Sequence, residues 1–111
     1  MDISVRKRSQ VQVIHLRGQL RLGQAVDELR QTIEESIGNG DTRFAINLAD
    51  VPMVDSSGIG LLIAASNTLA QKNGKLTVVN TAPEILRLMQ SMRLVSRLNI
   101  SGRLAAEPSH E

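Results

Sequence analysis

The feature of the sequence that most constrains its fold is a change of hydrophobic period between residues 44 and 62. From Phe44 to Leu48 every second residue is bulky and apolar, which is the two-residue period of a strand. From Ile59 onward the apolar residues recur at steps of three and four, which is the period of a helix. A strand therefore leads, through a short proline-containing turn, into a helix that begins near Ser57.

Asp55, Ser56 and Ser57 stand at this change of period. The first amides of a helix have no carbonyl four residues back, so an Asp or Ser oxygen placed there can accept their hydrogen bonds and cap the helix. The two serines therefore have a structural explanation as caps. They also have a chemical one, because the free amides and the dipole of a helix start tolerate an added phosphate.

The order of the remaining elements predicts a single α/β domain over residues 1–111, with its core at about 3–100. Because a helix joins the strand at Val11 to the strand at Phe44, these two strands should be parallel. We thus expect one mixed, largely parallel sheet with helices packed on it. The expected elements are two short strands within 3–17, a helix over 24–37, a strand from 43, a helix over 57–72, a strand over 75–79, a helix that Thr81 caps, a strand over 94–100 and a tail over 101–111.

Two glycines in the expected second helix need an explanation. Gly58 and Gly60 would each cost an isolated helix about 1 kcal/mol relative to Ala. Their presence indicates a close approach of the helix to the sheet or to a partner. Functional loops of such sheets gather at the carboxyl ends of the strands, and residues 50–58 should lie at that edge.

The composition argues against several kinds of function. The chain has no cysteine, which excludes disulfides, thiolate catalysis and Cys-based metal sites and fits a reducing compartment. The longest apolar run, residues 59–65, is far shorter than the ~20 residues that span a bilayer. We therefore expect a soluble cytoplasmic protein without a transmembrane segment. Arginines gather near both ends of the chain, but a single aromatic residue and no recognition motif favour a solvated basic face over direct DNA or lipid binding.

No catalytic arrangement is evident, so we expect neither an enzyme nor a cofactor. A serine nucleophile needs a base and an oxyanion hole, yet His15 and His110 are the only imidazoles and no Gly-x-Ser-x-Gly elbow occurs. His15 has no partner at metal-ligand spacing, so a hydrogen-bonded or edge-exposed histidine is the better interpretation. Asp50 and Asp55 are better explained as turn and cap residues than as ligands of a cation.

Residues 47–62, NLADVPMVDSSGIGLL, resemble the signature of the STAS family, the domain of sulfate transporters and anti-sigma factor antagonists. The resemblance runs from the Val11 strand through Gly18-Gln19-Leu20, the signature and Gly74-Lys75-Leu76 to the last helix. In the bacterial antagonists, a partner kinase that is itself the anti-sigma factor phosphorylates the serine after the aspartate. The resemblance thus implies phosphorylation of Ser56. The partner-binding residues that it implies are Asp55, Ser56, Ser57, Gly58, Ile59, Gly60, Gln19 and Arg21.

The function that the resemblance implies is that of an anti-sigma factor antagonist. With Ser56 unphosphorylated, the protein sequesters an anti-sigma factor serine/threonine kinase and frees the sigma factor; a serine phosphatase reverses the modification. A phosphate adds about −1.5 to −2 charges and considerable bulk to a corner of small residues, so docking should weaken. The helix start is a ready anion site, so the fold itself should tolerate the phosphate.

One departure from the family pattern concerns the partner. Where the antagonists often have an acidic Gly-Glu-Leu-Asp run, this chain has Gly18-Gln19-Leu20-Arg21, with its charge reversed. The partner surface must then differ, or the partner is another protein. The competing interpretation keeps the STAS fold as a scaffold subunit of a stress-signalling or lipid-transport complex, with Ser56 only a helix cap. The sequence leaves the sigma factor, the kinase and the oligomeric state open.

Overall fold

The structure is a computed structural model of the 111-residue chain and describes residues 1–92 and 99–100. The expected last strand falls mostly outside these residues, as does the expected tail over 101–111. The described elements are, in chain order, β1 (Asp2–Arg8), β2 (Val11–Arg17), α1 (Gln24–Gly38), β3 (Arg43–Asp50), α2 (Ser56–Ala70), β4 (Lys75–Val79), α3 (Pro83–Ser91) and β5 (Asn99–Ile100).

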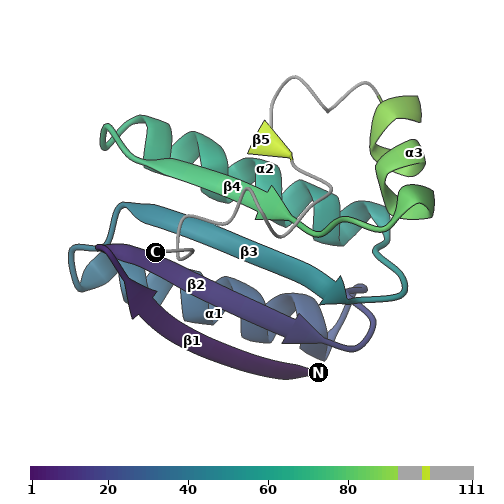
Figure 1. Ribbon diagram of the computed structural model, residues 1–111, viewed down its shortest axis with the longest axis horizontal. Coiled ribbons are helices and arrows are strands. Elements are labelled where there is room, and N and C mark those ends of the chain that lie inside the picture. Colours follow the sequence, from purple (N-terminus) through teal and green to yellow (C-terminus); the bar gives the residue numbers. More distant parts are fainter. Residues whose placement is uncertain (93–98, 101–111) are drawn as a thin grey trace.

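The described strands form one sheet in the order β1-β2-β3-β4-β5 (Figure 1). The first pair, β1 and β2, is an antiparallel hairpin whose turn residues Ser9 and Gln10 have φ values of 49° and 68°. Every following pair is parallel, and Gln12 of β2 lies opposite Phe44 of β3. The predicted mixed, largely parallel sheet is therefore confirmed, as is the parallel pairing of the strands at Val11 and Phe44.

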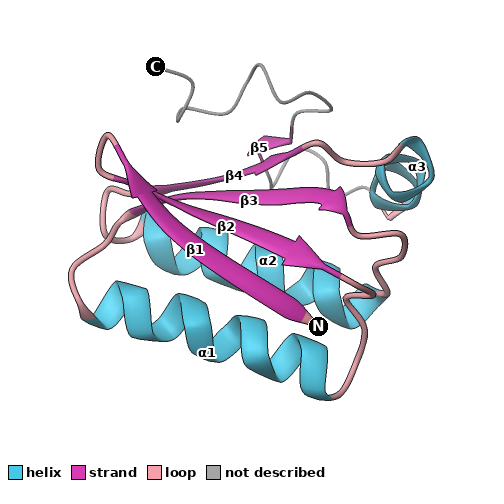
Figure 2. Ribbon diagram, turned by 60° about the horizontal axis from the view of Figure 1, so that its bottom comes forward, coloured by secondary structure: helices cyan, strands magenta, loops and turns pink. Residues whose placement is uncertain are grey.

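Helices α1 and α2 cover one face of this sheet, and α3 lies beside the carboxyl ends of β3 and β4 (Figure 2). Alternate strand residues point toward α1 and α2 and form the main core with the inner sides of these helices. Burial of each large aliphatic side chain contributes about 1.5–3 kcal/mol to folding. The residues at the centre of the core include Ile14, Leu16, Leu20, Leu29, Phe44, Ile46, Leu48, Ile59, Leu62, Leu69, Leu76 and Val78.

The ends of the helices agree with the sequence in part. Gly40, at a φ of 98°, supplies the left-handed residue that follows the end of α1. The expected capping role of Thr81 is wrong, because α3 begins one residue later than the signature suggests and Ala82 is its N-cap residue. The Thr81 side chain is instead buried, and its hydroxyl has no hydrogen-bond partner within the described part of the chain.

Candidate partner-binding site at the start of α2

The start of α2 is built around the carboxylate of Asp55, the N-cap residue of the helix. Its Oδ1 accepts a hydrogen bond from the Gly58 amide at 3.0 Å and from the Ser57 hydroxyl at 2.6 Å. Its Oδ2 accepts from the amide of Leu22, in the loop after β2, at 2.8 Å. The expectation of Asp55 as a cap residue is thus confirmed, and the interpretation of Ser56 or Ser57 as the cap is wrong.

These donors also determine the charge of the site. The hydrogen bond from the Ser57 hydroxyl is the main reason that the pKa of Asp55 falls from 3.8 to about 2, and the amides of Leu22 and Gly58 lower it further. Asp55 is therefore ionised at neutral pH. A full negative charge lies next to Ser56 before any modification takes place.

The two serines of the signature differ in availability. Ser56 is the first residue of α2; it is exposed, and its hydroxyl makes no hydrogen bond to any residue that the structure describes. Ser57 is half-buried and donates its hydroxyl hydrogen to Asp55. Only the Ser56 oxygen is free to react with, or to contact, another molecule without breaking an internal bond.

The fold brings the two predicted partner-binding segments together. Leu20 forms an isolated parallel bridge with Val54, its amide donates to the Met53 carbonyl at 2.9 Å, and its own carbonyl accepts from the Asp55 amide at 3.1 Å. The Leu20 side chain is fully buried. Gln19 and Arg21 on either side of it are exposed, and the Arg21 guanidinium donates to the Gln19 side-chain oxygen at 3.1 Å. Gln19 and Arg21 therefore lie close to Asp55 and the start of α2.

The glycines and Ile59 of the predicted set have different positions. A Cβ on Gly58 would come within 2.9 Å of side-chain atoms of Leu20 and Val54, so this glycine permits the close approach of α2 to the neighbouring loops. A Cβ on Gly60 would meet nothing within 4 Å, and the residue is exposed. Ile59 is fully buried and supports the site from beneath. Packing therefore explains Gly58, whereas nothing within the described fold requires Gly60.

Two exposed apolar residues near the start of α2 were not predicted from the sequence. The Leu22 side chain is 76% exposed although its amide is anchored on Asp55, and the Met53 side chain is 37% exposed. The signal in the sequence was that Leu22 is apolar although it lies between Arg21 and Gly23, in a loop that follows no periodic pattern. Both lie in the segments that meet at Asp55, the residue before Ser56, through the Leu22 amide and the Met53 carbonyl.

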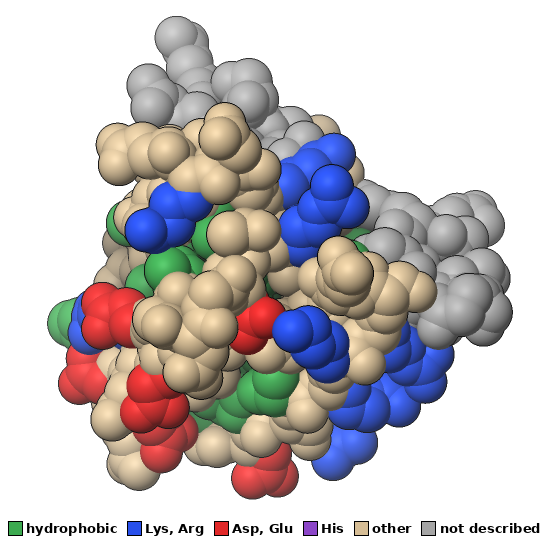
Figure 3. Space-filling model, turned by 90° about the vertical axis from the view of Figure 1, so that its left-hand side faces the viewer, with side chains coloured by type: hydrophobic (Ala, Val, Ile, Leu, Met, Phe, Trp, Pro, Cys, Tyr) green, Lys and Arg blue, Asp and Glu red, His purple; other side chains and the backbone are tan. Residues whose placement is uncertain are grey.

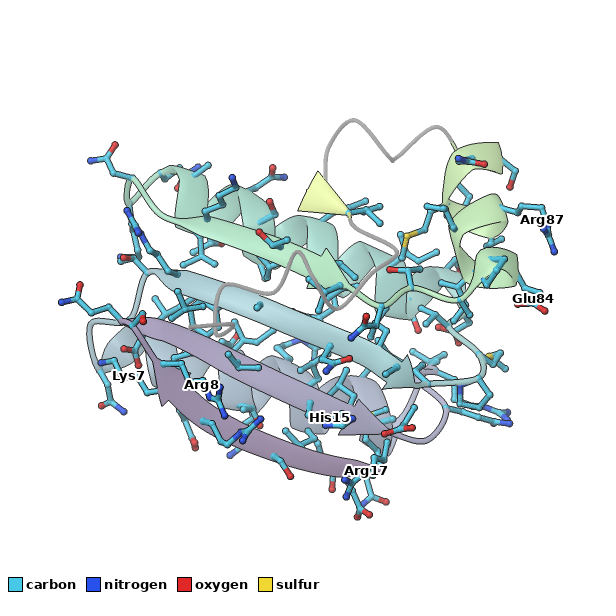
Figure 4. All side chains as sticks on the ribbon, viewed as in Figure 1. Lys7, Arg8, His15, Arg17, Glu84 and Arg87 are labelled. Atoms are coloured by element: carbon cyan, nitrogen blue, oxygen red, sulfur yellow. The ribbon has the colours of Figure 1, made fainter. Side chains whose placement is uncertain are left out.

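A polar cluster at the ends of β2 and β3 supports the loop after β2. His15 and Arg17 lie toward the carboxyl end of β2, away from Lys7 and Arg8 (Figure 4). The His15 Nε2 lies 2.8 Å and the Arg17 Nε 3.6 Å from Asp50 Oδ2, while the Asp50 carbonyl accepts from the Gly18 amide at 3.1 Å. The expectation of a hydrogen-bonded His15 is confirmed. Within residues 1–92 and 99–100, no group of three or more acidic, His or Cys side chains is placed to hold a metal ion.

Comparisons with known proteins agree with this architecture. Residues 2–106 match the sequence model of the STAS domain. The structure of the anti-sigma factor antagonist SpoIIAA in its unphosphorylated form is 26% identical, with a TM-score of 0.69 over 80% of this chain and 82% of that chain. The Bacillus SpoIIAA in its phosphorylated form is 25% identical, with a TM-score of 0.71 over 89% and 90%. A Thermotoga maritima protein reaches a TM-score of 0.86 over 93% and 88% at 13% identity.

None of the helices that the structure describes combines the length and the apolar character needed to cross a membrane.

Gly58 and Gly60 form a matched pair for a stability test. Gly58→Ala should lower the free energy of unfolding by about 1–3 kcal/mol, because the new methyl overlaps Leu20 and Val54. Gly60→Ala should raise it by about 0.5–1 kcal/mol, because the methyl meets no neighbour and Ala is the better helix former. Urea denaturation followed by circular dichroism measures both. Equal effects of the two substitutions would contradict this account of the helix start.

The titration of Asp55 tests the hydrogen bonds at the cap. Its pKa is lower in the folded protein than its ordinary value of 3.8, so its contribution to stability is present above about pH 4 and is lost as the pH falls through about 2. The Asp55 carboxyl carbon shift in NMR spectra should have a midpoint near 2. Ser57→Ala should raise this midpoint and Ser56→Ala should leave it unchanged, since of the two serine hydroxyls only that of Ser57 donates to the carboxylate. A midpoint near 3.8 in the unsubstituted protein would rule out the network.

Proposed function

The chain belongs to the STAS domain family, and on that basis we propose that it acts as an anti-sigma factor antagonist controlled by phosphorylation of Ser56. The unphosphorylated protein binds an anti-sigma factor serine/threonine kinase in the cytoplasm and so frees a sigma factor for transcription. The kinase phosphorylates Ser56 and is released, and a serine phosphatase restores binding. The chain is then the central component of a partner-switching pathway, of the kind that serves stress responses.

The observation that carries this proposal is the free, exposed hydroxyl of Ser56 at the first position of α2. Phosphorylation of this oxygen breaks no hydrogen bond within the described residues, and the helix dipole favours negative charge at this end. The fold therefore tolerates the phosphate. The half-buried Ser57 lacks this freedom, because its hydroxyl is part of the Asp55 network.

The surface around Ser56 supports docking of a protein. Leu22 and Met53 offer exposed apolar contact area, and Gly60 offers backbone that no side chain covers. Asp55 already contributes one negative charge, to which a phosphate adds about −1.5 to −2 more. A partner whose apolar side chains pack on this surface would then have to desolvate a dense group of charges. One modification can in this way abolish binding and leave the fold intact.

The positive charge in the loop after β2 favours a partner with an acidic surface. Arg21 is exposed and donates a hydrogen bond to the uncharged Gln19, so its positive charge is available to a carboxylate on the partner. Charges at the rim of an interface mainly select the partner and the rate of association. We therefore propose that the partner kinase has an acidic docking surface where it meets residues 19–21. The similarity to unphosphorylated SpoIIAA, an anti-sigma factor antagonist at 26% identity, supports the general role.

Phosphorylation of the matched serine variants tests the switch. Incubation with a serine/threonine kinase of the anti-sigma type from the same genome and labelled ATP should label the unsubstituted protein and Ser57→Ala but not Ser56→Ala. Ser56→Asp should weaken binding of that kinase at least tenfold, which is about 1.4 kcal/mol, while Ser56→Ala remains bound. Labelling of another residue, or equal affinities of the two Ser56 variants, would point to the scaffold role instead.

The apolar part of the surface has its own test. Leu22→Asp should weaken binding of the same kinase at least tenfold, because it places a charge where apolar contact is needed. The melting temperature should hardly change, since the side chain is 76% exposed and the anchoring bond comes from the backbone amide. Leu88→Asp, on the exposed side of α3, is the control and should bind normally. If both variants bind like the unsubstituted protein, residue 22 lies outside the interface.

A further inference from the structure

The edge of the sheet where the parallel strands begin carries a second group of polar side chains. Strand residues alternate between the two faces, and Phe44 and Leu76 point into the core beneath the sheet. Their neighbours Arg43 and Lys75 therefore lie on the face that α1 and α2 leave open. The register places Arg43 of β3 directly opposite Lys75 of β4.

A cavity of about 510 Å³ lies at this edge. Its size is in the range of small-molecule sites, which is about 300–1,000 Å³. The described lining residues offer a guanidinium, an ammonium, an amide and a hydroxyl as hydrogen-bond donors, and no carboxylate is among them. These residues are Val11, Arg43, Phe44, Asn73, Gly74, Lys75 and Thr77.

The pairing of Arg43 with Lys75 is unfavourable without a ligand. Neighbouring strands are about 4.8 Å apart, and like charges directly opposite each other destabilise a sheet. Neither side chain has an ion pair or a hydrogen bond with any residue in the described part of the chain, whereas Lys7 nearby lies 3.0 Å from Asp41. Figure 3, which looks at this end of the molecule, shows most of its Lys and Arg side chains gathered over the right-hand half.

Backbone hydrogen bonds fix where the main chain of this cationic pair lies. The Lys75 amide donates to the Thr42 carbonyl at 2.9 Å, and the Gly74 amide donates to the Leu69 carbonyl at 2.7 Å. A Cβ on Gly74 would overlap the Thr42 carbonyl oxygen, so the turn before β4 is packed directly against the start of β3. The backbone around the site is therefore in place before any ligand arrives, which lowers part of the entropic cost of binding.

We propose that this cavity binds the phosphoryl group of a small ligand, with Arg43 and Lys75 sharing its oxygens. The planar fork of an arginine matches two phosphoryl oxygens at once, and the lysine ammonium adds a point charge. Together they balance a dianion and relieve the repulsion between the strands. The Asn73 amide and the Thr77 hydroxyl are at hand as further donors. A free phosphorylated compound or a phospholipid headgroup supplies this chemistry.

This site is distinct from the proposed switch. The strand β3 has eight residues and is roughly 25 Å long, and the cavity lies at its beginning whereas Ser56 follows its end. The anion site can therefore be tested independently of the kinase. It also differs from the usual position of ligands in such sheets, which is the carboxyl edge.

Titration of the full chain with sodium pyrophosphate at low ionic strength, followed by amide NMR, is the direct test. We expect saturable shifts at residues 43–44 and 73–77. Arg43→Gln combined with Lys75→Gln should weaken binding at least tenfold. Lys72→Gln removes a neighbouring exposed lysine that does not line the cavity and should bind normally. Ser56→Ala should also bind normally, so failure of the switch and failure of this site give different results.

Two further measurements decide the outcome. Without ligand, Arg43→Gln should leave the melting temperature unchanged or raise it, and added salt should remove any gain, because the substitution relieves repulsion between exposed charges. Binding to phosphatidylcholine vesicles only after phosphatidic acid is added, without pyrophosphate shifts, would assign the site to a headgroup. Shifts that do not saturate, or that Lys72→Gln reduces as much as the double substitution does, would overturn the proposal.

Discussion

The ionised carboxylate of Asp55 is the group on which the arrangement of the candidate site depends. It accepts hydrogen bonds from Ser57 and Gly58 in α2 and from Leu22 in a loop 33 residues earlier in the chain. One side chain thereby caps the helix, fixes the loop after β2 and occupies the hydroxyl of one serine. Ser56, which lies between the cap and the capped residues, keeps its hydroxyl free. In the run Asp-Ser-Ser, Ser57 thus has a structural role, whereas Ser56 keeps a hydroxyl that is available to a partner.

The regular part of the fold could be predicted because it follows from local patterns. The period change at residues 44–62 and the helix between two strands determine the parallel pairing of β2 and β3. Asp55 and the two serines were all candidate caps of α2, and the choice among them could not be made from the sequence, since Asp and Ser are equally good caps and the outcome depends on the backbone angles of single residues. The anchoring of Leu22 on Asp55 is a tertiary contact without a local signal. The family resemblance alone suggested Gln19 and Arg21.

Gly58 and Gly60 show why one residue type can have two explanations within a single helical turn. A side chain at position 58 would collide with Leu20 and Val54, so packing accounts for this glycine. At position 60 a side chain would meet no neighbour, so packing does not require a glycine there, and the glycine lowers the helix propensity of α2. Residues that lower stability without a role in packing are expected at sites of interaction. Under the proposed function, Gly60 lets a partner approach α2 closely, and this accounts for the helix propensity that the glycine lowers.

The two ends of β3 carry different groups. We expect only a small coupling free energy between these two ends through the strand. Coupling between distant sites requires an element with two discrete arrangements that both sites bias. The residues from Phe44 to Asn47 are all buried and are paired on both sides with parallel strands, which argues against a second arrangement of this part of β3. Charge at Ser56 is in addition more than about two Debye lengths from Arg43 at physiological salt. The switch and the cationic cavity are therefore expected to act independently, through whatever each binds.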